Sequence, residues 1–278
     1  MSTEPTTSPG LSPIYDRDPI VASITRYYEL LSKMVSIRPK HIEYPPEGDW
    51  GDDIIPLEKL RRLGFDERMI DLVRHIPYVA SNRPVFPSTQ TVNYFQNVFS
   101  EPVEEFQLED PNRVRLWPVP DERIPEGIVP LSQWLNGDKL GIWWLLDTKT
   151  GELTAHDAWI SRPPDEVPED EPWRTARPVP AVTYFDGLCE NLRSLELVPV
   201  PGDSRGSEWG MWQPKFMRSE KWISEAQAIY RKCHWPDVER FRRQKCRKLL
   251  VEMQDRITKE EEEGRERREE ERAKLAVA

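Results

Sequence analysis

The apolar positions of this chain change from helical to strand-like spacing as the sequence proceeds. Apolar side chains recur every three or four residues over 20–35 and again over 69–76, which predicts two amphipathic helices. Asp18 or Pro19 opens the first helix, and Asp66 caps the second. Shorter helices are predicted over 55–64, closed by Gly64, and over 91–99.

The clearest strand runs from Gly141 to Asp147. Its apolar run, IWWLL, indicates a central strand that is covered on both faces. Turn-forming residues over 147–151 then return the chain in a second strand over 152–155. Further strands are predicted at 114–119, at 128–131 and near Trp159. Helices followed by short strands predict an α+β fold, with a small antiparallel sheet packed by helices.

After the strands, the pattern predicts a closing helix, a connector and a helical extension. Thr183 can cap a helix whose apolar positions form a buried stripe over 184–195. Ser219 opens a further helix, and Pro236 breaks the chain and begins another. After Thr258 nearly every residue is charged, so this last helix is predicted to be solvated and to fray.

Composition and pattern divide the chain into four segments. They are a disordered tail rich in Ser, Thr and Pro, the α+β domain, a connector with the C-terminal helices, and a charged tail that is helical or frayed. Their bounds are 1–18, 19–200, 201–258 and 259–278. Within the domain, residues 161–180 are rich in proline and acid, and we expect a mobile surface insert with Trp173 as its anchor.

Charge and cysteine content restrict the partners and the compartment. The formal net charge of −10 argues against broad binding to nucleic acid or to anionic lipid. The three cysteines, Cys189, Cys233 and Cys246, lie in predicted helices and are expected to be buried free thiols, which favours a reducing compartment. The sequence shows no secretory signal and no apolar run long enough to cross a membrane, so we expect a cytoplasmic or nuclear protein without a membrane partner.

The sequence does not reveal a reaction. The four histidines lack metal-ligand spacing, and neither a phosphate-binding loop nor a nucleophile elbow is present, so no catalytic residue, metal or cofactor is assigned. An enzyme would need a nucleophile such as Cys189 to meet His156 and Asp157 in the fold. The alternative for Cys189 is a buried structural thiol, because its predicted helix is largely apolar.

Two features are candidates for partner binding. The first is the basic run that includes Arg240, Arg242, Arg243 and Lys245, which could contact phosphates or an acidic partner, or could simply face solvent. The second is the pair Trp143 and Trp144, which must face opposite sides of their strand. Both can belong to the core, or one can line a groove that binds a partner.

Three segments resemble the SUKH superfamily, the group that includes fungal cell-wall-synthesis regulators. The strand–loop–strand section of that family is similar to PLSQWLNGDKLGIWWLLDTKTGELTAHDAW, its final helix to TYFDGLCENLRSL, and its first helical elements to IPLEKLRRLGFDERMIDLVRHIPYV. The resemblance covers residues 20–198; the insert at 161–180 and the extension after Ser219 depart from it. It implies a SUKH-like α+β fold and a binding role, since members include bacterial immunity proteins against toxins and fungal regulators of cell-wall synthesis and signalling.

These observations favour a non-catalytic protein-binding adaptor or regulatory module whose partners are other proteins. One alternative is a small-molecule enzyme of a type that the sequence does not identify. The other is binding of nucleic acid, or of an acidic partner, through the basic C-terminal helix.

Overall fold

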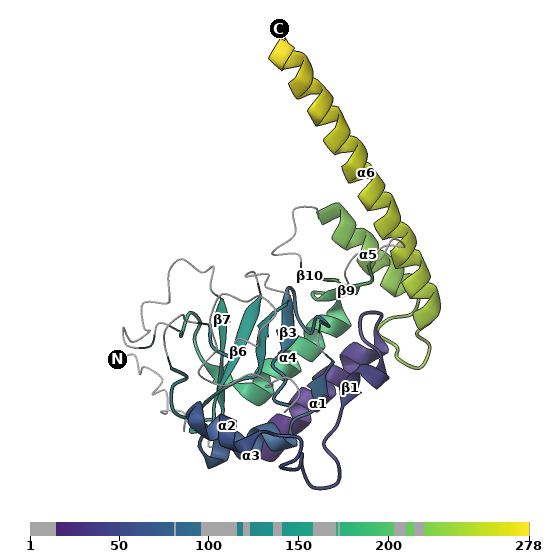
Figure 1. Cartoon of the computed structure of the whole chain (residues 1–278). Coiled ribbons are helices and arrows are strands. Elements are labelled where there is room, and N and C mark those ends of the chain that lie inside the picture. Colours follow the sequence, from purple (N-terminus) through teal and green to yellow (C-terminus); the bar gives the residue numbers. More distant parts are fainter. Residues whose placement is uncertain are drawn as a thin grey trace, which may run out of the picture.

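An antiparallel sheet organises the chain in the computed structural model (Figure 1). The structure describes residues 15–80, 82–95, 116–118, 123–135, 141–157, 171, 173–202, 210–213 and 220–277. Strand β6 (Ile142–Asp147) lies between β4 (Ile128–Pro130) and β7 (Glu152–Asp157), and β8 (Val179–Pro180) pairs with the far side of β7. The α+β class and the central position of β6 are therefore confirmed.

The β6–β7 hairpin forms as its turn residues predict. The Asp147 carboxylate accepts a hydrogen bond from the Lys149 N–H at 2.7 Å, and the Gly151 N–H donates to the Asp147 carbonyl at 2.8 Å. Gly151 has a φ of +75°, a conformation that glycine adopts without strain. The turn fixes a register in which Trp143 lies opposite His156.

Strand β5 (Ser132–Trp134) extends the sheet along β6 beyond the end of β4. The Ser132 hydroxyl accepts from the Trp144 N–H at 2.8 Å and donates to the Ile142 carbonyl at 2.9 Å. Strand β3 (Thr89–Thr91) pairs with β5, and no helix follows over 92–95. The predicted helix over 91–99 is thus wrong for 91–95, because strand pairing prevails over the local spacing of apolar residues; 96–99 lie outside the described residues.

Two helices cover one face of the sheet, α1 (Arg17–Lys33) and α4 (Ala181–Ser194), and they pack against each other. The Asp16 carboxylate caps α1, so this helix begins earlier than Asp18 or Pro19. Helix α4 begins two residues before the predicted cap, Thr183. It needs no side-chain cap at that point, because the Ala181 N–H donates to the Gly151 carbonyl at 3.0 Å.

The remaining N-terminal elements pack around α1 and next to β3. They are η1 (Pro39–His41), β1 (Ile42–Glu43), α2 (Leu57–Arg62), α3 (Glu67–His75) and β2 (Tyr78–Val79). The two predicted helix boundaries here are confirmed: Gly64 follows α2 with a φ of +92°, and the Asp66 carboxylate accepts the N–H groups of Arg68 and Met69 at the start of α3.

The C-terminal elements belong to the same core. They are β9 (Val198–Val200), β10 (Gly210–Trp212), α5 (Glu220–Lys232) and α6 (Arg243–Val277). Their buried residues include Ile223, Ala226, Tyr230, Cys246, Leu250, Met253 and Ile257. The helix predicted to begin at Pro236 is wrong, because turns follow this proline and the Arg242 N–H bonds back to the Cys233 carbonyl before α6 begins. Ser219 lies outside the described residues.

Two predicted boundary segments need correction. Residues 15–18 of the predicted disordered tail are ordered, in the cap and the first turn of α1, and residues 1–14 lie outside the described residues. The end of the predicted mobile insert is packed, since Trp173 is 3% exposed and β8 pairs with β7; residues 161–170 and 172 lie outside the described residues. Trp159 also lies outside them, and the described part of the predicted strand over 114–119 is not a strand.

The cysteines are buried and free, as their odd number predicts. A thiol hydrogen bond joins Cys246 to Cys233, and burial raises the pKa of Cys246 well above its ordinary value. None of the described helices combines the length and the apolar character that crossing a bilayer requires.

Candidate functional site

Trp143 and Trp144 are both completely buried, on opposite faces of the sheet. Trp144 faces α4, where its ring meets Phe185 edge-on and its indole N–H donates to the Tyr184 hydroxyl at 2.9 Å. Trp143 packs edge-on against Trp134, with ring centroids 5.9 Å apart. The core alternative is confirmed. The groove alternative is wrong, because neither ring reaches the surface to meet a partner.

The structure does not assemble His156 and Cys189 into a catalytic site. His156 lies opposite Trp143 in the sheet, so its side chain is on the face away from α4, which carries Cys189. The His156 Nδ1 is 2.7 Å from the Trp173 carbonyl oxygen, and burial lowers the pKa of His156. Burial raises the pKa of Cys189 and keeps its thiol protonated. The structure therefore does not bring His156 and Cys189 together as a nucleophilic site would require, and the enzyme alternative stays a prediction.

The basic run does not form one continuous stripe. Arg240 lies in a turn before α6, with its guanidinium 3.9 Å from the Asp237 carboxylate. Arg242 and Lys245 are exposed and form no ion pair with any residue that the structure describes. The structure therefore does not offer a regular series of phosphate contacts along this helix.

Arg243 has a structural position. Its Nε donates to the Met34 carbonyl at 2.6 Å, and its Nη2 donates to the Ile37 carbonyl at 2.9 Å. These carbonyls lie just past the end of α1, so the half-buried guanidinium joins α6 to α1. Burial and the neighbouring Arg38 lower the pKa of Arg243.

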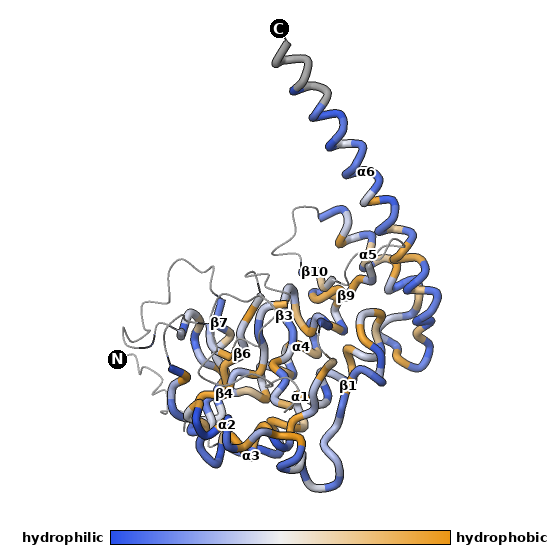
Figure 2. Tube along the Cα trace, in the orientation of Figure 1, coloured by the Kyte–Doolittle hydropathy of each residue, from blue (hydrophilic) through white to orange (hydrophobic). Residues whose placement is uncertain are grey.

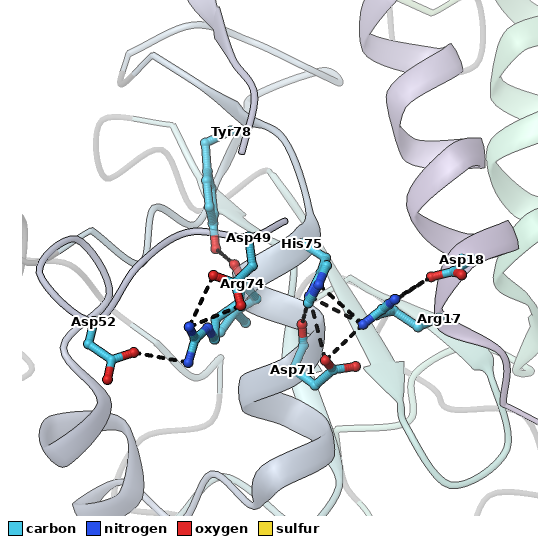
Figure 3. Close-up of polar contacts among 9 residues, drawn as sticks. Arg17, Asp18, Asp49, Asp52, Asp71, Arg74, His75 and Tyr78 are labelled. Atoms are coloured by element: carbon cyan, nitrogen blue, oxygen red, sulfur yellow. Dashed lines mark hydrogen bonds and ion pairs between the residues drawn. The ribbon is translucent and has the colours of Figure 1, made fainter. Parts of the chain in front are cut away.

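A second polar cluster joins the start of α1 to α3 and to the loop before α2 (Figure 3). Arg17 contacts the Asp71 carboxylate at 2.8 Å and the His75 ring at 3.2 Å, and Arg74 contacts the Asp49 carboxylate at 3.0 Å. Both guanidinium groups face a carboxylate, so the cluster stabilises this packing and leaves no charge for a ligand. No group of three or more His, Cys, Asp or Glu residues in the described part of the chain could hold a metal ion.

Four cationic side chains surround His41, and we call them the cationic patch: Arg38, Lys40, Arg83 and Arg243. Burial and these four charges lower the pKa of His41. Among the described residues, no carboxylate forms an ion pair with Arg38, Lys40 or Arg83. The cationic patch is therefore positively charged, although the chain as a whole has a net charge of −10.

The sequence argument missed this patch because its members come from three distant segments. Only Arg243 was a candidate, and the structure gives it the most buried position of the four basic residues that the sequence singled out. The signal that could have found the patch is RPKH at 38–41, where three basic side chains flank one proline. Its relation to Arg83 and α6 depends on tertiary packing.

The outer part of α6 is a second exposed feature, and we call residues 258–277 the outer α6. Among the side chains of α6 that the structure describes, Ile257 is the last buried apolar one, and the helix then leaves the body of the molecule (Figures 1 and 2). At about 1.5 Å per residue, the outer α6 extends for about 30 Å. The helical alternative for the charged tail is confirmed.

Comparison with known proteins adds no family: no family model, curated protein or solved structure matches this chain. The argument for function therefore depends on the cationic patch and on the outer α6.

Proposed function

We propose that this chain is a protein-binding module, an adaptor or regulator, and that the outer α6 is its principal contact element. The observation that carries the proposal is the continuation of α6 beyond Ile257, where the helix no longer contributes to the core. A helix whose described side chains are mostly exposed presents much of its surface to another molecule.

The inner half of α6 gives the outer half a defined direction. The Arg256 guanidinium binds both carboxylate oxygens of Glu225 on α5, at 2.6 and 2.7 Å, immediately before the helix leaves the core. Beyond this point, pairs such as Lys259 with Glu263 at 3.8 Å support the helix by only about 0.2–0.5 kcal/mol each. The arm is thus held firmly at its base and weakly along its length, so a partner can stabilise it on binding.

The family resemblance supports the same conclusion. The helix α4 follows the β6–β7 hairpin and β8 and covers the sheet, in the order expected of a SUKH-like domain, and members of that superfamily act by binding. Membership of the superfamily is part of the proposal. The three free thiols support a reducing compartment, the cytosol or the nucleus, as the place where binding occurs.

The test is capture of partners from a cell extract with four baits: the full chain, a chain ending at Thr258, and the variants Glu266→Pro and Glu266→Ala. Glu266 is exposed in the outer α6, and proline interrupts the helix at a cost of about 3 kcal/mol while alanine preserves it. A chain ending at Asp203 is unsuitable, because it lacks the buried side chains of α5 and α6.

We expect the full chain and Glu266→Ala to retain the same specific partners, and the other two baits to lose them. Retention by the chain ending at Thr258 would show that the outer α6 is not the contact element. Absence of any partner specific to the full chain, against an unrelated bait of equal net charge, would refute protein binding itself.

A further inference from the structure

The cationic patch is held in place by backbone contacts in all three segments that form it. The His41 carbonyl accepts from the Ala80 N–H at 2.8 Å, and β1 pairs with β2, which joins η1 to the chain that leads to Arg83. The two bonds of Arg243 to the carbonyls of Met34 and Ile37 fix the start of α6 beside η1. The three segments that carry the cations are therefore held together before any ligand binds, which reduces the entropy lost on binding.

The charges of the patch repel one another, and no carboxylate in the described part of the chain forms an ion pair with Arg38, Lys40 or Arg83. Arg38 acts on both His41 and Arg243, in each case in the direction that disfavours the protonated form. Arg38 and Lys40 are exposed and Arg83 is half-buried, so a ligand can reach all three. The His41 Nδ1 accepts the Arg38 backbone N–H at 3.1 Å, which suits a neutral imidazole. A compact anion at this point would offset the repulsion.

The dimensions and surroundings of the patch favour a single phosphate group over a nucleic acid. Nucleic-acid affinity comes from many phosphates bound in series, whereas these four cations belong to three segments that meet at η1, and all of them act on the one imidazole of His41. The chain as a whole has a net charge of −10, and α6 carries four consecutive glutamates at 260–263, so a long polyanion would be repelled. Arginine guanidinium groups can bind phosphate oxygens in pairs, and a phosphate monoester carries a charge of about −1.5 to −2 at neutral pH.

We propose that the cationic patch binds a phosphorylated side chain of a partner protein, with Arg38, Lys40 and Arg83 as the phosphate-binding residues and Arg243 as a positioning residue. The proposal rests on the protein-binding function proposed above. It adds a second contact, specific for the modified form of the partner, to the contact made by the outer α6.

The first test follows the His41 imidazole by NMR while the full chain is titrated with N-acetyl-phosphoserine amide, and separately with inorganic phosphate. His41→Gln identifies the signal among the four histidines. Bound phosphate must raise the pKa of His41, because it offsets the surrounding cations. Binding of the phosphoserine derivative should weaken by about tenfold or more in Arg38→Gln/Arg83→Gln, and remain unchanged in Lys149→Gln, whose ammonium lies 3.2 Å from the Glu126 carboxylate outside both proposed contact sites.

Three results would overturn the proposal. The pKa of His41 could stay the same with both phosphate compounds, or the double variant could bind the phosphoserine derivative as tightly as wild type does. The third is tighter binding of an RNA or DNA oligonucleotide than of the phosphoserine derivative. A thermal unfolding curve for each variant verifies that it is folded, and the wild-type titration decides independently of any variant.

The second test separates this inference from the proposed function. Partners captured by the full chain are compared before and after phosphatase treatment of the extract, with wild type and Arg38→Gln/Arg83→Gln as baits. We expect phosphatase treatment of the extract and the double substitution in the bait each to reduce the amount of partner captured. Partners that withstand both would leave protein binding in place and overturn the phosphate site, whereas the loss of every partner in the untreated wild-type sample would refute protein binding.

Discussion

Replacement of Arg243 by alanine tests whether the C-terminal helices are part of the domain. The guanidinium connects the first turn of α6 to the carbonyls of Met34 and Ile37, which follow α1. The bond joins two distant parts of the chain, because Arg243 and Met34 are 209 residues apart in sequence. Loss of the side chain leaves both carbonyls without this donor.

The expected loss is about 2 kcal/mol. A hydrogen bond from a charged donor contributes about 1.5–3 kcal/mol, so two such bonds set an upper bound of about 3–6 kcal/mol. The real figure is smaller, because Arg243 is half-buried and water can replace part of each bond. Removal of the cation also relieves repulsion from Arg38 and Arg247. Arg243→Lys should retain about half of the stabilisation, since one ammonium cannot reproduce the planar fork of donors.

Urea unfolding followed by far-UV circular dichroism measures this loss, with Lys245→Ala as the control. Lys245 is exposed in the same turn and makes no ion pair with any described residue, so its removal should change stability by less than about 0.5 kcal/mol. Equal stability of Arg243→Ala and the control would show that α6 does not depend on this contact, and the argument for a shared core would fail.

Three further results are expected. Trp144→Phe should reduce the free energy of unfolding by about 1 kcal/mol more than Trp143→Phe, because, of these two indole N–H groups, only that of Trp144 has an acceptor among the described residues; equal losses in denaturant titrations would contradict this bond. Burial lowers the pKa of His156, so below pH of about 6.5 the unfolded chain takes up a proton that the folded chain does not. The free energy of unfolding should therefore fall as the pH falls through this value. His156→Gln should flatten the pH dependence of the free energy of unfolding measured between pH 7.5 and 5.5. A chain ending at Thr258 should retain the free energy of unfolding within about 0.5 kcal/mol, whereas one ending at Asp203 should lose its cooperative thermal transition; equal curves would place the core elsewhere.

The sequence predicts the sheet centre and several helix boundaries because these features have local causes. Five consecutive apolar residues and a turn ending at Gly151 determine the β6–β7 hairpin, whatever packs around it. The side chain of Asp66 and the positive φ of Gly64 likewise set helix ends through contacts within a few residues.

The predictions that failed depend on contacts between distant segments. Thr89–Thr91 becomes a strand because β5 offers an edge there, and the first turn of α4 is satisfied by the Gly151 carbonyl from the hairpin. The end of the insert expected to be mobile is packed instead, because β8 pairs with β7 and the Trp173 carbonyl lies 2.7 Å from the His156 ring. The cationic patch has the same character: no local pattern places Arg83 beside η1 and α6.

Native-state hydrogen exchange along α6 tests most directly the division of this helix, on which the proposed contact element depends. The account predicts slow exchange for amides from Cys246 to Ile257, close to the rate of global unfolding, because this half is packed in the core. It predicts fast exchange throughout the outer α6, which is stabilised only by weak pairs along the helix. Equal protection from Cys246 to Val277 would contradict a free arm, and fast exchange before Ile257 would contradict its attachment to the domain.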